Sequence, residues 1–183
     1  MAEAPAPSTT VWDIDPNHST AEFSIRHMMI TTVKGRFSGI TGAVEGDPED
    51  LAAARVHLEI DLATVDTRQP ERDNHLRSAD FFDVEKYPTM TFTSRRITRT
   101  GTNTYDVAGD LTIHGITKDV VCQVTYEGQG KDPWGGIRAG YTAVTSLNRK
   151  DFGLMWNVAL EAGGVLVGDQ VKVSVELETV KRA

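Results

Sequence analysis

A chain of 183 residues with 39% hydrophobic and 25% charged residues has the composition of one globular domain. Its formal net charge of -7 repels phosphate backbones, so nucleic acid is not an expected partner. The mean hydropathy of -0.30 excludes a membrane-embedded chain, and a single cysteine, Cys122, excludes an internal disulfide.

The first ten residues are rich in Ala and Pro, and they contain neither a basic start nor the apolar run of an export signal. We therefore expect a flexible leader at 1–10, one domain at 11–183 and a cytoplasmic location. No internal repeat or linker divides the chain further.

From Val11 onward, apolar residues recur mostly at every second position, which is the period of a strand with one buried face. This alternation predicts strands at 11–15, 21–33, 37–45, 56–62, 90–94, 105–113, 120–126, 137–147 and 165–179. Two segments break the pattern. Residues 70–82 begin with Pro and acidic residues, as a short helix does, and 148–157 fit a second short helix or a compact loop.

The last predicted strand is long and cleanly alternating, and the strands offer only one apolar face. Long antiparallel strands of this kind favour a closed barrel, because closure pairs every strand edge. We predict an all-β fold, an extended antiparallel lipocalin-like β-barrel of about eight strands with one or two short helices. A two-sheet sandwich is the structural alternative.

Small residues on the apolar faces, among them Ala21, Gly109 and Ala143, alternate with large ones such as Phe23 and Phe92. An eight-stranded barrel is either filled by side chains or holds one small ligand, and small inward residues leave room for a ligand. A dry tube of this shape suits a linear hydrocarbon. The alternative is a solid core, which would make the chain an interaction module.

We expect the inward-facing residues to contact the hydrocarbon, with His27, Arg36 or Tyr141 orienting a polar head group. The predicted ligand-binding residues are Phe23, Ile25, His27, Met29, Arg36, Phe37, Leu58, Ile60, Met90, Phe92, Leu111, Ile113, Ala139, Tyr141, Ala143, Leu154, Trp156, Val173 and Val175.

The sequence lacks the Gly-x-Ser-x-Gly, P-loop, His-Glu-x-x-His and paired Cys-x-x-Cys motifs. We therefore expect no enzymatic activity, no catalytic cofactor and no metal. The competing hypothesis is a metal- or histidine-dependent enzyme, either at Glu71 and His75, which stand four residues apart, or at Asp15 with His18.

Several runs of residues carry a family resemblance: 14–19 (Ile-Asp-Pro-Asn-His-Ser), 33–39 (Val-Lys-Gly-Arg-Phe-Ser-Gly), 72–84, 109–117 and 148–154. On these runs the chain resembles the YceI-like family of polyisoprenoid-binding proteins from about Trp12 to Leu177. The resemblance implies an extended lipocalin-like barrel that holds an amphiphile with an isoprenoid or quinone-like tail, often as a dimer.

Together, the residues and the resemblance predict a bacterial lipid-binding protein. It would carry or store a polyisoprenoid or isoprenoid quinone, with a fatty-acid-derived amphiphile as the alternative. Its expected partners are a long-chain apolar small molecule and a second copy in a homodimer.

Overall fold

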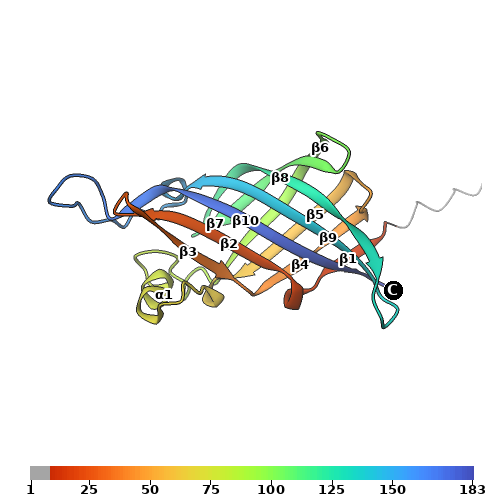
Figure 1. Ribbon diagram of the computed structural model, residues 1–183, viewed down its shortest axis with the longest axis horizontal. Helices are drawn as coiled ribbons and strands as arrows, with labels where there is room; N and C mark the ends of the chain where they lie inside the picture. Colours follow the sequence, from red (N-terminus) through yellow and green to blue (C-terminus); the bar gives the residue numbers. More distant parts are fainter. Residues whose placement is uncertain (1–8) are drawn as a thin grey trace, which may run out of the picture.

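The computed structural model describes residues 9–183, which form ten β-strands and a few short helices (Figure 1). The strands are β1 (Val11–Ile14), β2 (Thr20–His27), β3 (Thr31–Phe37), β4 (Ile40–Asp47), β5 (Asp50–Asp61), β6 (Thr89–Arg99), β7 (Thr104–Ile113), β8 (Ile116–Lys131), β9 (Ile137–Asn148) and β10 (Val167–Lys181). Most of the leader predicted at 1–10 lies outside the described residues.

Antiparallel pairing closes the sheet into a barrel. Eight strands form the ring in the order β1-β4-β5-β6-β7-β8-β9-β10, and β10 pairs back onto β1. The remaining two strands, β2 and β3, extend the barrel wall. The first part of β10 pairs with β2 and its last residues pair with β1, while β3 pairs with the other edge of β2. The predicted extended antiparallel lipocalin-like barrel is confirmed.

The single strand predicted at 21–33 is wrong, because the chain reverses at residues 28–30. The Ile30 N–H donates to the His27 carbonyl at 3.1 Å, and Met28 and Met29 have φ of 50° and 62°. The error has a simple origin: Met29 and Val33 keep the same parity as the inward residues of β2, so the alternation continues through the turn.

The strand predicted at 37–45 also begins later, because residues 38 and 39 leave the ladder. The N–H groups of Ser38 and Gly39 donate to the Thr64 hydroxyl at 3.3 and 3.2 Å. Phe37 therefore ends β3, and β4 starts at Ile40.

The helical segments are short. Helix α1 (Pro70–Arg77) has Pro in its first turn and is capped by the Gln69 side chain, which accepts from the Arg72 N–H at 2.9 Å. It ends at Arg77, before the predicted end at Phe82. The 3₁₀ turns are η1 (Pro16–His18), η2 (Leu62–Thr64) and η3 (Arg149–Phe152), so a 3₁₀ turn and a loop occupy 148–157. Within 9–183, no helix combines the length and apolarity that crossing a membrane would demand.

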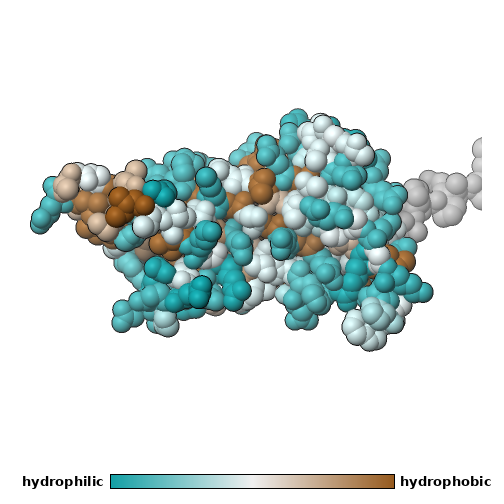
Figure 2. Space-filling model, in the orientation of Figure 1, coloured by the Kyte–Doolittle hydropathy of each residue, from teal (hydrophilic) through white to brown (hydrophobic). Residues whose placement is uncertain are grey.

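Large side chains fill one end of the barrel. Trp12, Ile97, Tyr105 and Ala139 belong to a buried core cluster there. The outer surface is mostly hydrophilic in the view shown, with apolar residues gathered at one end of the long axis (Figure 2). The packed end leaves the rest of the barrel interior for the cavity described next.

Candidate functional site

An apolar cavity of about 390 Å³ occupies the barrel interior. Alternate residues of most strands line it, because successive side chains of a strand point to opposite faces. On β10, for example, Val171, Val173 and Val175 face the cavity, while Lys172 and Ser174 do not. The volume lies within the range of about 300–1,000 Å³ typical of small-molecule sites.

Sixteen of the nineteen predicted ligand-binding residues line this cavity, and their contact with a ligand stays a prediction. They are Phe23, Ile25, His27, Phe37, Leu58, Ile60, Met90, Phe92, Leu111, Ile113, Tyr141, Ala143, Leu154, Trp156, Val173 and Val175.

Three predicted residues lie elsewhere. Met29 is 58% exposed on the β2–β3 turn, because the chain reverses there. Arg36 has the outward parity of β3, and its guanidinium lies 3.4 Å from the Asp66 carboxylate. Ala139 points inward but sits in the packed cluster with Trp12, beyond the cavity.

Most charged or ionisable residues that line the cavity are basic, and we name them the basic rim, although the exposed Glu22 also lines the cavity. The exposed side chains of Arg26 and Arg72 belong to this rim, together with half-buried His27 and His75. Arg72 donates from Nε to the Thr67 hydroxyl and from a terminal nitrogen to the Thr67 carbonyl, both at 2.8 Å. Within residues 9–183, no carboxylate lies within 4 Å of the Arg26 or Arg72 guanidinium. These cations are therefore available to a polar head group.

Arg149 on η3 is hydrogen-bonded to the segment that follows η3 and to the start of β10. Its buried guanidinium donates to the carbonyls of Leu154, Trp156 and Gly168 at 2.6, 2.9 and 2.7 Å. Its nearest carboxylate, on Asp169, is 3.8 Å away. Burial lowers the pKa of Arg149 below its ordinary value. The side chain thus supports the cavity wall and adds positive charge beside it.

Two polar groups face the apolar interior. The Tyr141 hydroxyl is buried and has no hydrogen-bond partner among residues 9–183, and burial raises its pKa above the ordinary range. The Cys122 thiol also lines the cavity, and burial raises its pKa to about 11. Both groups stay neutral at pH 7, so the interior carries no charge at these positions.

The predicted pairing of Glu71 with His75 does not form. His75 Nε2 lies 2.8 Å from Asp80 Oδ2 instead. The His75 ring packs edge-on against Trp156 and Phe81, with centroids 4.7 and 5.1 Å apart. The imidazole therefore belongs to an aromatic cluster at the rim.

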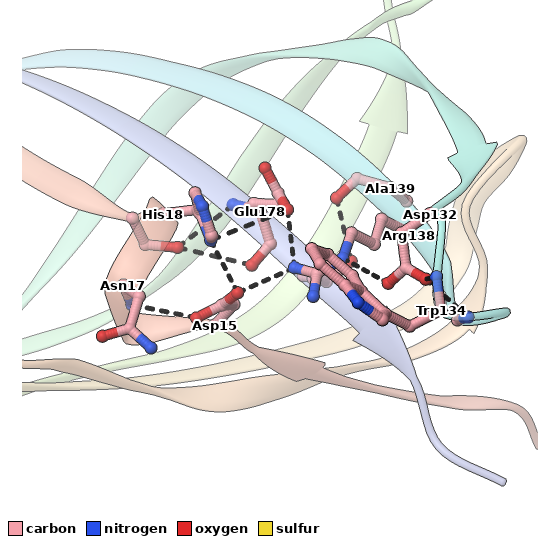
Figure 3. A network of polar contacts seen from close by, with 11 residues as sticks. Asp15, Asn17, His18, Asp132, Trp134, Arg138, Ala139 and Glu178 are labelled. Atoms are coloured by element: carbon pink, nitrogen blue, oxygen red, sulfur yellow. Dashed lines mark hydrogen bonds and ion pairs between the residues drawn. The ribbon is translucent and has the colours of Figure 1, made fainter.

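Asp15 and His18 do meet, on the outside of the barrel (Figure 3). His18 Nδ1 lies 2.8 Å from Asp15 Oδ2, and Arg138 donates to Asp15 and Glu178 at 2.7 Å each and to Asp132 at 2.9 Å. Hydrogen bonds from His18 and then Arg138 lower the pKa of Asp15 from 3.8 to about 2. We name Asp15, His18, Asp132, Arg138 and Glu178 the Arg138 clamp.

The clamp residues Asp15, His18 and Glu178 are spaced as metal ligands could be, with ligand atoms within 4.8 Å of one another. However, the Arg138 guanidinium already occupies the space between the two carboxylates and neutralises them. None of the three lines the cavity. The arrangement joins η1, the β8–β9 turn and β10, which indicates a structural role.

Sequence reasoning missed the rim residues Thr67, Arg72 and Arg149 and the residues Leu166 and Val167. Thr67, Arg72 and Arg149 come from α1, η3 and the loop before α1, where no strand alternation shows which side chains face inward. Leu166 and Val167 lie within the strand predicted at 165–179 but were not among the predicted ligand-binding residues. The concentration of charged and aromatic residues at 148–152 was the available signal for Arg149.

The fold and cavity define the class: a closed antiparallel barrel that is packed at one end, hollow along the rest and open at a basic rim. The YceI-like domain model matches residues 12–179, so the chain belongs to the YceI-like family.

Curated relatives are similar over most of their length. A UPF0312 protein of Vibrio cholerae is 42% identical over 144 residues, covering 79% of this chain and 76% of the relative. A UPF0312 protein of Pseudomonas savastanoi is 41% identical over 144 residues, covering 79% and 75%.

Solved structures share the architecture. Burkholderia cenocepacia BcnA superposes with a TM-score of 0.77 at 26% identity, covering 90% of this chain and 98% of that one. The Campylobacter jejuni YCEI protein gives a TM-score of 0.72 at 29% identity, covering 86% and 90%. A polyisoprenoid binding domain from Saccharophagus degradans gives 0.72 at 17% identity, covering 93% and 98%, and shows the shared fold.

Proposed function

We propose that this protein binds a long-chain amphiphile, a polyisoprenoid or an isoprenoid quinone, inside the barrel and carries or stores it. The observation that carries the proposal is the apolar cavity, which is lined almost wholly by hydrocarbon side chains and opens at a basic rim. The polyisoprenoid binding domain of S. degradans has the same fold, so the fold accommodates this ligand class elsewhere.

Burial of the tail would supply most of the affinity. Each methylene transferred from water into such a cavity contributes roughly 0.8 kcal/mol, so affinity should rise with chain length until the cavity is full. The head group would remain at the rim, beside His27 and Arg72. Binding of a long chain thus needs no covalent chemistry, in keeping with the expected lack of catalysis.

A fatty-acid-derived amphiphile is the second candidate, because an acyl chain fills the same tube and a carboxylate suits the basic rim. The cytoplasmic location, the homodimer and the absence of a catalytic cofactor stay predictions.

A chain-length series tests the proposal. Titrations of prenyl alcohols, isoprenoid quinones and fatty acids of increasing length would be followed by protection of Cys122 from an apolar thiol reagent, because this thiol lines the cavity. We expect affinity to rise with length and prenyl chains to protect better than acyl chains. Stronger protection by acyl chains would favour the second candidate, and no protection by any chain would contradict both.

A further inference from the structure

Exposed apolar side chains gather around the β2–β3 turn. Met28, Met29 and Ile30 are 40%, 58% and 70% exposed, and Met155 and Val158, in the segment before β10, are 59% and 46% exposed. Apolar residues are visible together at that end of the long axis (Figure 2). The two segments touch, because the Met28 N–H donates to the Leu166 carbonyl at 2.8 Å. We name Met28, Met29, Ile30, Met155 and Val158 the apolar tip.

The backbone makes these methionines unusual. Met28 and Met29 have φ of 50° and 62°, the left-handed region that costs free energy for any side chain with a Cβ. Turn residues with positive φ strongly favour Gly, Asn or Asp, and Asn and Asp are polar. The backbone conformation and the exposure to solvent both favour Asn or Gly at these two positions, so neither explains two exposed methionines.

The apolar tip is continuous with the cavity rim. Arg26 and His27, which directly precede the turn, line the cavity, as do Trp156 and Leu166 in the second segment. An apolar chain that leaves the cavity at this end would therefore pass directly beside the tip. The tip therefore lies next to the place where, under the proposed function, a ligand would enter or leave.

We propose that the apolar tip docks on the surface of a lipid bilayer and that the ligand passes there between bilayer and cavity. The inference rests on the proposed lipid ligand, because a long-chain lipid resides in bilayers. Exposed apolar side chains can enter the boundary between lipid head groups and acyl chains, and here they adjoin the cavity that would receive the lipid.

Two charged residues lie at the tip: Arg26 at the base of the turn, and the exposed Glu161 between Val158 and Leu166. The Arg26 guanidinium, at the base of the turn, donates to the Met29 carbonyl and the Thr32 hydroxyl at 3.1 Å each. No carboxylate in the described part of the chain lies within 4 Å of it. Its charge is therefore available to a lipid phosphate, although the protein as a whole is acidic.

Vesicle flotation with a turn variant tests the proposal. The variant Met28→Asn/Met29→Gly/Ile30→Thr removes the apolar side chains of the turn and installs the residues that its backbone prefers, so it should fold at least as well as the parent protein. Vesicles would contain phosphatidylethanolamine and phosphatidylglycerol. We expect the parent protein to float with them and the variant to bind at least about tenfold more weakly.

The control variant is Val121→Thr/Val144→Thr, which changes apolar residues of similar exposure, 50% and 46%, on the barrel wall. It should float like the parent protein. Failure of the parent to float, or equal flotation of the turn variant, would overturn the proposal. If the turn variant changes only the oligomeric state, as measured by light scattering, the tip is a contact between two copies of the chain. That result would also overturn the proposal.

Ligand uptake from detergent solution separates this inference from the proposed function. The turn variant should take up a prenyl probe from detergent as the parent does, but receive it from vesicles more slowly, by about tenfold. If the parent floats with vesicles but neither protein takes up the probe, the proposed ligand is wrong, whereas the tip still binds a bilayer.

Discussion

At the scale of the residue, Ala143 keeps the cavity open. It lies opposite Val124 on β8 and Val175 on β10, and all three line the cavity. Replacing Ala143 by Trp should fill this space, at the usual overpacking cost of about 1–3 kcal/mol, and reduce uptake of prenyl probes. Val144→Trp is the matched control, because Val144 is 46% exposed on the outer face of the same strand. Equal uptake by both variants would show that the ligand does not reach Ala143.

Tyr141 gives a second prediction at this scale. Its hydroxyl is buried without a partner, which carries a desolvation cost of about 1–3 kcal/mol. Tyr141→Phe should therefore leave the ligand-free protein as stable as the parent or more stable in urea unfolding. Tyr105→Phe is the comparison, because the Tyr105 hydroxyl donates to the Glu49 carbonyl at 3.4 Å. Marked destabilisation by Tyr141→Phe would mean that the hydroxyl has a partner, such as water.

At the scale of the element, the Arg138 clamp ties η1, the β8–β9 turn and β10 together outside the barrel. The folded state lowers the pKa of Asp15 from 3.8 to about 2, so its ionised form is stabilised by folding. This contribution is present in full above about pH 4 and is lost as the pH falls through about 2.

The measurement compares urea unfolding of the parent and Asp15→Asn from pH 7 to pH 2. We expect Asp15→Asn to be less stable by about 1 kcal/mol at pH 7, after allowance for solvent screening, and the difference to vanish near pH 2. Asp119→Asn is the control, because its ion pair with Arg95 is exposed and should contribute little. A stability difference between the two proteins that grows as the pH falls would show that folding does not favour the ionised form of Asp15.

The strands could be predicted from the sequence more completely than the turns and helical segments. Strand alternation predicted the barrel and many of the cavity-lining strand residues, because a strand exposes alternate residues to each face, as on β9 and β10. It missed the turn at residues 28–30, where side-chain parity continues through the reversal. It could not place Arg72 or Arg149, because their positions depend on hydrogen bonds to distant carbonyls and hydroxyls in non-strand segments.

At the scale of the whole molecule, a barrel with one packed and one open end determines the direction of binding. The cluster around Trp12 and Tyr105 fills one end, so under the proposed function an apolar tail would enter at the basic rim and leave its head group there. The exposed methionines Met28 and Met29 lie next to this rim, where the proposed docking would need them.

A bound ligand should also stabilise the whole molecule. A lipid that binds only the folded state adds RT ln(1 + [L]/Kd) to the free energy of unfolding, about 2.7 kcal/mol at a free concentration one hundred times Kd. Removing lipid by organic extraction and refolding should therefore lower Tm, and adding back a long prenyl chain should restore it. An unchanged Tm after both steps would argue against a ligand in the cavity.

Native mass spectrometry of the purified protein tests the hollow, lipid-holding barrel most directly. A lipid-filled barrel should show a mass excess equal to one long-chain amphiphile, which organic extraction removes and which matches a species in the extract. A protein that shows its bare mass, and that also takes up none of the prenyl or acyl chains offered to it, would not be a lipid-binding barrel.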